Sequence, residues 1–178
     1  KNCLVIYGPS DTGKSFFAYS LIGFLRGRVI SQMNKQSQFW LQPLSEAKIG
    51  LLDDATYDCW KFIDIHMRTA LDGNMVSVDY KHRAPLQMKL PPLIITTNYY
   101  VKEDQALMYL HSRVHCLHFP NKMPLTEAGK PLYEINDCAW KLFFRKLANQ
   151  LDLTVPEKED GVADTAFQCC PRSSLEPN

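Results

Sequence analysis

The sequence predicts an α/β domain whose central, mostly parallel sheet is flanked by helices, with a β-hairpin projecting from it. Short apolar segments rich in strand-forming residues, such as 3–7 and 93–97, alternate with longer segments of helical periodicity. These strand segments are apolar throughout rather than alternating, which is typical of parallel strands covered on both faces. One later segment switches to a period of two residues and predicts the hairpin.

Composition supports one folded domain and excludes several classes of protein. The chain has 178 residues, of which 46% are hydrophobic and 22% are charged, and its net charge is +1. A chain of this kind can bury a core, so it does not belong to the intrinsically disordered class. No apolar run approaches the ~20 residues of a membrane span, so we expect no membrane contact. The chain has neither an initial Met nor a signal-peptide pattern, so we expect a piece of a longer protein.

Charge and cysteine content add weaker constraints. Lys and Arg outnumber Asp and Glu over residues 1–150, whereas the remaining tail is acidic, a pattern compatible with nucleic-acid contact. The six cysteines include no C-x-x-C pair, and we expect the reduced, buried thiols of an intracellular protein. A zinc site at His115, Cys116 and His118 is disfavoured, because these residues lie in an alternating strand pattern without a second ligand pair.

The expected elements follow the chain in order. An apolar strand over 3–7 ends at turn-forming residues, and a helix over 15–25 closes at Gly27. Residues 39–41 are expected on a short helix or loop, and residues 120–135 are rich in turn formers. Further strands are expected at 29–30, 49–52, 93–97 and 114–119, and further helices at 60–71 with a stop at Gly73, at 102–110 and at 137–151.

The hairpin is expected to carry a basic tip. Its arms, 76–80 and 86–90, alternate apolar and polar residues, and Lys81, His82 and Arg83 lie between them. A stiff two-stranded arm with such a tip can contact the phosphates of nucleic acid.

The segment after the first strand matches G-x-x-x-x-G-K-[ST] and predicts a P-loop. It consists of Gly8, Pro9, Ser10, Asp11, Thr12, Gly13, Lys14 and Ser15. A strand precedes it and a helix follows, as the motif requires. Glycines let backbone N–H groups turn toward phosphates, and the helix N-terminus adds positive potential. We therefore expect ATP as the ligand, with Lys14 on the β- and γ-phosphates and Ser15 on Mg²⁺.

Two further strand ends complete the expected catalytic set. Asp53 and Asp54 follow an apolar strand; Asp53 would bind Mg²⁺, and Asp54 would orient or deprotonate the attacking water. Asn98 follows the next strong strand and would contact the γ-phosphate and that water. The interval between Lys14 and Asp53 leaves room for an extra strand, which together with the second acid favours the ATPase branch of P-loop proteins over small kinases.

Taken together, the sequence resembles the helicase domain of papillomavirus replication initiators, which are viral superfamily 3 DNA helicases of the AAA+ class. The resemblance rests on the P-loop, the Asp53–Asp54 pair, segments 71–74 and 109–113, the hairpin tip at 81–82, and the strand ending at Asn98. It implies an AAA+-like P-loop fold. The expected organisation is one ATPase and helicase domain over 1–155 and an acidic, partly disordered tail over 156–178.

The resemblance implies a hexameric ring with ATP at each subunit interface. Arg113 would then reach the γ-phosphate of the neighbouring subunit as an arginine finger, and Arg68 would supply a second basic group in trans. From its position alone, Arg113 suits a surface ion pair equally well.

For DNA, the resemblance assigns Lys81 and His82 to a tracking hairpin in the ring channel, with Arg83 matched less firmly. It places Phe39 beside the same DNA, although packing against Trp40 is the alternative interpretation.

The sequence therefore predicts an ATP-dependent DNA helicase of viral genome replication. The resemblance further implies a host nuclear location. It also implies contacts with single-stranded DNA, a viral origin-binding transcription regulator, host polymerase α–primase and single-strand binding protein. Two alternatives stay open at this point: a P-loop nucleotide kinase, which would need an acceptor pocket and usually an Arg-rich lid, and a nonenzymatic ATP-binding interaction module.

Overall fold

The structure is a computed structural model that describes residues 3–30 and 40–151. The contacts divide the chain into two units, Lys1–Phe143 and Phe144–Asn178. Every described strand belongs to the first unit, whereas helix α5 (Asp137–Gln150) begins in the first unit and continues into the second. The domain boundary expected after residue 155 lies outside the described residues.

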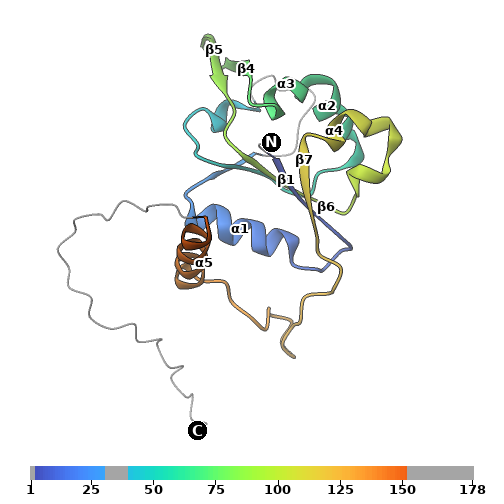
Figure 1. The fold of residues 1–178 in the computed structure, drawn as a ribbon, viewed down its shortest axis with the longest axis vertical. Helices are drawn as coiled ribbons and strands as arrows, with labels where there is room; N and C mark the ends of the chain where they lie inside the picture. The colour runs from blue at the N-terminus through green and yellow to red at the C-terminus, as the bar shows by residue number, and fades with distance from the viewer. Residues whose placement is uncertain (1–2, 31–39, 152–178) are drawn as a thin grey trace, which may run out of the picture. The chain divides into compact units, whose positions relative to one another are not determined.

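A parallel sheet forms the centre of the first unit (Figure 1). Among the described residues it has five strands in the order β2-β3-β6-β1-β7, and each pairing is parallel. The strands are β1 (Cys3–Tyr7), β2 (Arg28–Ile30), β3 (Gly50–Leu52), β6 (Leu93–Thr97) and β7 (Val114–His118). The expected α/β class is confirmed. Because β6 lies between β1 and β3, the segments that follow these three strands meet at one edge of the sheet.

Both faces of the sheet are covered. Strands β3 and β6 are buried at every position, as apolar segments without polar alternation predict, and the two threonines that end β6 are buried as well. On one face Ile95 packs in a core cluster with Trp60 and Ile63 of α2 (Tyr57–His66). Helix α1 (Lys14–Phe24) lies on the other face (Figure 1). Each large apolar side chain buried here stabilises the fold by about 1.5–3 kcal/mol.

The end of α1 is a Schellman motif. The N–H of Gly27 donates to the carbonyl of Ile22 at 2.9 Å, and the N–H of Arg26 donates to that of Gly23 at 3.2 Å. The helix therefore ends just before Gly27, as the sequence predicts. The residue in the left-handed conformation is nevertheless Arg26, with φ of 52°, and not the glycine that follows it.

The helix expected over 60–71 is divided into α2 and α3 (Arg68–Leu71). Met67 interrupts it, because its φ of −120° and ψ of 4° depart from helical values. After α3 the N–H groups of Gly73 and Asn74 bond to the carbonyls of Ala70 and Thr69 at 3.0 and 3.1 Å, so the stop expected at Gly73 is confirmed.

The single helix expected over 102–110 is wrong. The segment forms two short 3₁₀ helices, η2 (Val101–Glu103) and η3 (Gln105–Leu107), followed by one helical turn, α4 (Met108–His111). Asp104 separates them in an extended conformation, and its carboxylate accepts a hydrogen bond from the N–H of Ala106 at 2.8 Å. An Asp side chain that binds nearby backbone groups competes with helix formation in this way.

The remaining elements agree with the sequence. Strands β4 (Met75–Tyr80) and β5 (Arg83–Lys89) form a separate antiparallel hairpin, seen at the top of Figure 1. A 3₁₀ helix, η1 (Gln42–Leu44), follows Trp40 and Leu41. Within residues 3–30 and 40–151, no helix has the length and apolar character needed to cross a membrane.

Candidate functional site

The P-loop joins β1 to α1 through a backbone that glycine permits. Gly8 has φ of 152° and Gly13 has φ of 82°, and the exposed Asp11 between them has φ of 64°. A Cβ on Gly8 would come within 2.1 Å of the carbonyl oxygen of Phe119, so any larger residue would displace that segment. Around these residues, Pro9 and Ser10 are exposed and Thr12 is buried.

Lys14 points into the loop. Only 7% of this residue is exposed, and its ammonium donates to the carbonyls of Gly8 at 2.9 Å and Pro9 at 2.5 Å. Thr12 Oγ1 lies 3.4 Å from the same nitrogen and itself donates to the Pro9 carbonyl. Burial lowers the pKa of Lys14, and nearby carboxylates, led by Asp54, act in the opposite direction. The loop therefore holds one positive charge at its centre.

Three side chains from three elements meet at Asp53. Its Oδ1 accepts hydrogen bonds from the hydroxyls of Ser15 at 2.7 Å and Thr96 at 2.5 Å. Ser15 comes from the first turn of α1, Asp53 follows β3, and Thr96 lies in β6. The structure thus brings the predicted residues Ser15 and Asp53 together and adds Thr96, which sequence reasoning missed. The available signal was a threonine near the carboxyl end of an apolar strand, which marks a polar group at that edge but not its partner.

The same threonine holds the second carboxylate in place. Thr96 Oγ1 accepts a hydrogen bond from the backbone N–H of Asp54 at 2.8 Å, and Thr96 is 1% exposed. Asp54 is exposed and has φ of 52°, a left-handed backbone conformation that departs from the extended conformation of β3. Backbone strain of this kind is concentrated at functional sites.

Asn98 lies at the same edge. It is exposed and directly follows β6, the strand between β1 and β3. The strand order therefore brings the P-loop, the acid pair and Asn98 to one edge of the sheet, where polar oxygens and nitrogens surround a phosphate-binding loop.

Arg113 and Arg68 lie elsewhere. Arg113 directly precedes β7, whose first residue, Val114, pairs with Cys3 at the start of β1, so Arg113 lies at the edge opposite the P-loop. Its guanidinium forms an ion pair with Asp72, with Nη2 to Oδ2 at 2.9 Å. The surface ion pair that its position alone suggested is therefore present.

Arg68 is paired as well. Its guanidinium donates to Asp64 through Nε at 3.0 Å and Nη2 at 2.6 Å, and these hydrogen bonds raise its pKa. It also lies over the ring of Tyr109, with 4.2 Å between Cζ and the ring centroid. Arg113 donates to the carbonyl of Tyr109, so both arginines meet at this exposed tyrosine.

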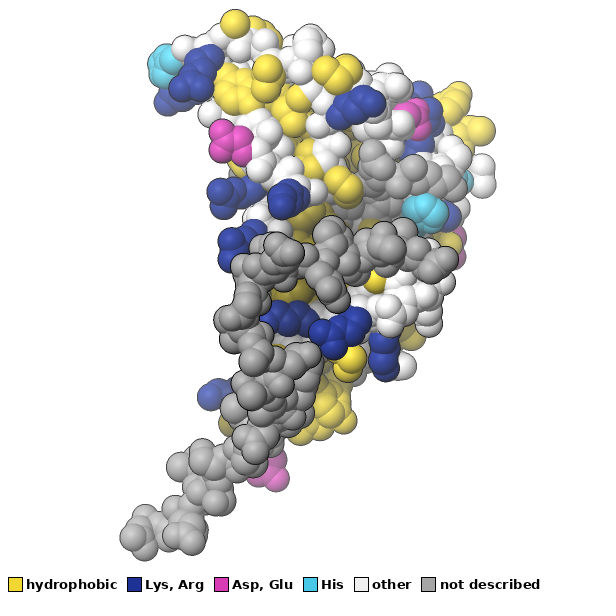
Figure 2. Space-filling view, turned by 60° about the vertical axis from the view of Figure 1, so that its left-hand side comes forward, with side chains coloured by type: hydrophobic (Ala, Val, Ile, Leu, Met, Phe, Trp, Pro, Cys, Tyr) yellow, Lys and Arg dark blue, Asp and Glu magenta, His cyan; other side chains and the backbone are white. Residues whose placement is uncertain are grey.

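Three of the four predicted DNA-contacting residues belong to the hairpin. Lys81 and His82 form the exposed turn, and His82 has φ of 62°. Arg83 is the first residue of β5 and pairs with Tyr80, so its expected place in the turn is wrong by one position. Figure 2 shows basic side chains and a histidine at the upper end, where the hairpin turn lies. Phe39 lies outside the described residues.

Comparisons with known proteins agree on the family. The sequence profile described as papillomavirus helicase matches residues 1–169. Replication protein E1 of Human papillomavirus 65 is 58% identical over 175 residues, and that of Bos taurus papillomavirus 6 is 54% identical over 175 residues. Each alignment covers 98% of this chain and 29% of the relative, so the chain spans under a third of these proteins.

Solved structures support the fold. A crystal structure of JCV helicase with a small organic compound bound has a TM-score of 0.57 at 21% identity, covering 68% of this chain and 36% of that one. The apo structure of the NrS-1 C-terminal region has a TM-score of 0.53 at 17% identity, covering 81% of this chain and 35% of that one. These likenesses agree with a P-loop, AAA+-like sheet. On the match of its sequence over residues 1–169, the chain belongs to the papillomavirus helicase family.

Proposed function

We propose that the chain is the ATP-hydrolysing motor of a DNA helicase that unwinds DNA during viral genome replication. The observation that carries this proposal is the hydrogen-bonded set of Ser15, Asp53 and Thr96 beside the Lys14 loop. A P-loop alone binds phosphates, whereas an acid pair at the end of β3, at the same edge of the sheet, adds the groups that hydrolysis needs. The family and its name, papillomavirus helicase, support DNA unwinding as the work done.

The residues present fit ATP and Mg²⁺. The Ser15 hydroxyl and the Asp53 carboxylate are the hard oxygen ligands that Mg²⁺ prefers. Mg²⁺ held there would neutralise charge on the β- and γ-phosphates. Lys14 would place its ammonium on the same phosphates.

Asp54 and Asn98 would act on the attacking water. The Asp54 carboxylate is exposed at the strand edge, where it can accept a hydrogen bond or a proton from water. The Asn98 amide can donate to the γ-phosphate and accept from water, because it carries both kinds of group. Thr96 would keep Asp53 and Asp54 in fixed directions without contacting the nucleotide.

Arg113 and Arg68 would serve a neighbouring subunit. Arg113 lies at the edge opposite the P-loop, and Arg68 meets it at Tyr109, so both are remote from the nucleotide site proposed for their own chain. Ion pairs with Asp72 and Asp64 would hold the two guanidinium groups at this surface until a ring forms. A hexameric ring with ATP at each interface would give them a γ-phosphate to stabilise.

Lys81 and His82 would contact single-stranded DNA in the ring channel. The turn that carries them is exposed at the end of a two-stranded arm. Contacts to phosphates would grip DNA of any sequence. We further propose host nuclear location and docking of a viral origin-binding transcription regulator, host polymerase α–primase and single-strand binding protein, which the resemblance alone supports.

Strand displacement by assembled rings tests the proposal. A forked DNA duplex is mixed with ATP and the parental protein or Lys14→Ala, in a preparation long enough to form rings. We expect separation of the strands by the parental protein alone. Failure of parental rings to displace a strand would contradict the proposal, and phosphate transfer to an added nucleoside would favour the kinase alternative, which the comparisons do not support.

A further inference from the structure

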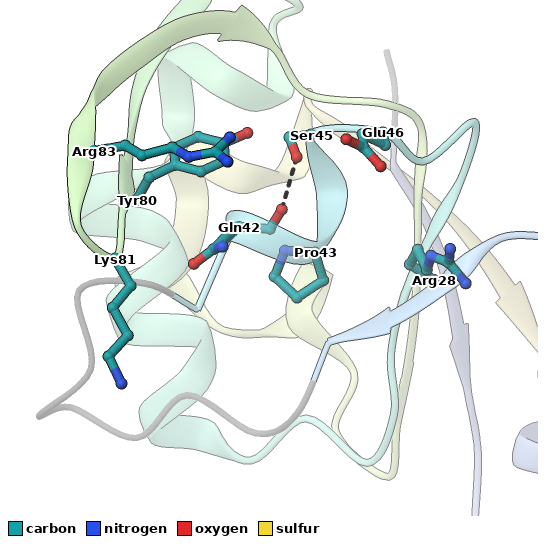
Figure 3. Close-up of a pocket in the computed structure, with 8 residues that line it drawn as sticks. All are labelled: Arg28, Gln42, Pro43, Ser45, Glu46, Tyr80, Lys81 and Arg83. Atoms are coloured by element: carbon teal, nitrogen blue, oxygen red, sulfur yellow. Dashed lines mark hydrogen bonds between the residues drawn. The ribbon is translucent and has the colours of Figure 1, made fainter.

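A hollow beside the hairpin turn gathers cationic side chains that the nucleotide site does not use (Figure 3). Its volume is about 520 Å³, within the range of about 300–1,000 Å³ found for ligand pockets. Tyr80, Lys81 and Arg83 of the hairpin line it together with Arg28 of β2. Residues of η1 and the two residues that follow it, Ser45 and Glu46, supply the rest of the lining, so the hollow lies between the hairpin and the sheet.

The charges around this hollow are unbalanced. Arg28, Lys81 and Arg83 are exposed cations, and Glu46 is the one carboxylate among the described residues that line the hollow. In the part of the chain that the structure describes, none of the three cations forms an ion pair within 4.0 Å. A concave surface with excess positive charge concentrates anions.

The walls of the hollow differ in chemistry. Tyr80 and Arg83 are paired across the hairpin and lie together on one side in Figure 3, with Arg28 on the other side. Between them, Ser45 Oγ donates to the Gln42 carbonyl at 2.9 Å and keeps η1 folded. An arginine fork suits the two oxygens of a phosphate, and a half-buried tyrosine ring offers a face on which a base can stack.

The hollow continues along the hairpin. A second hollow of about 270 Å³ is lined by Tyr80, Arg83, Ser45 and Glu46, which also line the first, and by Ala84 and Leu86 of β5. The two therefore adjoin and form one groove that runs from the turn along β5. A groove of this form suits a chain-like anion better than a free phosphate.

We propose that this groove binds the backbone of single-stranded DNA beside the nucleotide that the turn contacts. Arg83 and Arg28 each hold a backbone phosphate from opposite sides of the hollow, and Tyr80 stacks on a base. The proposal rests on the proposed helicase function and deepens it, because it assigns Arg83 to the groove rather than to the turn and adds Arg28 and Tyr80 as DNA contacts. Arg28 lies in β2 and Tyr80 in β4, so the groove forms only when the hairpin packs beside β2 and η1.

Binding of a fluorescent single-stranded oligonucleotide to assembled rings, titrated over a range of salt concentrations, tests the groove. The variants are Arg28→Gln, Arg83→Gln and Tyr80→Leu. The matched control is Arg26→Gln, which removes an exposed arginine two positions from Arg28 and outside the groove lining. Far-UV circular dichroism verifies that each variant folds.

Each variant has its own expected signature. Arg28→Gln and Arg83→Gln flatten the slope of log affinity against log salt by about 0.7 for each phosphate that the variant no longer neutralises. Tyr80→Leu weakens binding by about 5-fold or more without changing the slope, because stacking carries no counterion. Arg26→Gln leaves affinity and slope at parental values. Losses of equal size on thymine, adenine and cytosine oligonucleotides support backbone contact.

The outcomes separate this proposal from the proposed function. The groove proposal would be overturned if the three groove variants kept the parental DNA affinity and salt slope while Lys81→Ala weakened DNA binding. The proposed helicase function would still stand in that case. Absence of DNA binding by parental rings would overturn both. Displacement of the oligonucleotide by inorganic phosphate at millimolar concentration would overturn the chain-like ligand. A peptide of residues 152–178 provides a further test. If Arg28→Gln weakened binding of this peptide but left DNA binding unchanged, the groove would be assigned to the acidic tail instead.

Discussion

The hydroxyl of Ser15 donates to the carboxylate of Asp53 at 2.7 Å, although 38 positions separate the two residues in the chain. This hydrogen bond ties the start of α1 to the end of β3 across the intervening strand β6. Thr96 of β6 donates to the same carboxylate oxygen, so all three elements contribute to one group. The nucleotide site proposed for this chain depends on that arrangement.

Replacing Thr96 with Val should affect both stability and turnover. Val has nearly the same shape but leaves the Asp54 N–H without its buried acceptor, which costs about 1–3 kcal/mol of unfolding free energy. Turnover of ATP should fall more than ATP binding, because the carboxylates lose their fixed directions. Denaturant unfolding and separate measurement of kcat and KM check this, and Thr96→Ser should restore kcat. Parental kcat in Thr96→Val would show that the threonine only stabilises the strand.

Substitutions of Asp53 and Asp54 should differ in their effects on ATP binding and ATP turnover. Asp53→Asn should weaken binding of Mg²⁺–ATP, because an amide is a poorer Mg²⁺ ligand than a carboxylate. Asp54→Asn should bind ATP at parental strength and lose turnover, since an amide does not accept a proton from water. Equilibrium binding of a fluorescent ATP analogue and steady-state hydrolysis distinguish the two. Equal loss of binding in both variants would contradict this division.

Arg113 should act across a subunit interface. We expect Arg113→Ala to lower ATP hydrolysis by about 10³-fold or more in assembled rings, the scale typical of an arginine finger. Mixed rings of Arg113→Ala and Lys14→Ala subunits should regain some hydrolysis, because some interfaces then contain one intact Lys14 and one intact Arg113. Native mass spectrometry verifies the mixing. Mixed rings with no more activity than either variant would argue against action in trans.

Cys3 should remain unreactive until the fold opens. Burial raises the pKa of its thiol to about 12, and only 3% of the residue is exposed, whereas Cys138 is exposed. In a Cys169→Ser, Cys170→Ser background, iodoacetamide at pH 8.5 should label Cys138 at once and Cys3 only in denaturant.

The raised pKa of Cys3 makes the stability of the fold depend on pH. The folded pKa of Cys3 exceeds that of an unfolded thiol, about 8.5, so its contribution is complete below that pH and declines as pH rises toward 12. Cys3→Ala should make the fall in unfolding free energy above pH 8.5 less steep. An unchanged slope, or rapid labelling of folded Cys3, would contradict its burial.

The sequence was sufficient to place side chains wherever their position depends on local pattern. The P-loop is a continuous motif whose context, strand before and helix after, can be read from periodicity. Asp53 and Asn98 were predicted because each directly follows an apolar strand, and parallel strands bring such ends to one edge. The five strands were predicted for the same reason, since their apolar segments are short and bounded by turn residues.

The sequence was insufficient where contacts between distant segments determine the partner of a side chain. Nothing near Thr96 indicates that its hydroxyl faces Asp53, because the order of strands in the sheet creates that contact. Likewise, the ion pair of Arg113 with Asp72 joins two residues that are 41 positions apart in the chain. Asp104 broke an expected helix through a hydrogen bond to its own local backbone, which apolar periodicity does not reveal.

The most direct test of the proposed motor is ATP hydrolysis by assembled rings with and without single-stranded DNA, in the parental protein and in Lys14→Ala. We expect the parental rate to rise when DNA is added, because the hairpin and the nucleotide site then act in one cycle. We expect Lys14→Ala to fold normally and hydrolyse no ATP with or without DNA, since it lacks the ammonium that we propose contacts the phosphates. Near-parental hydrolysis by Lys14→Ala, or a parental rate indifferent to DNA, would contradict the assignment of this chain as a DNA-driven ATPase.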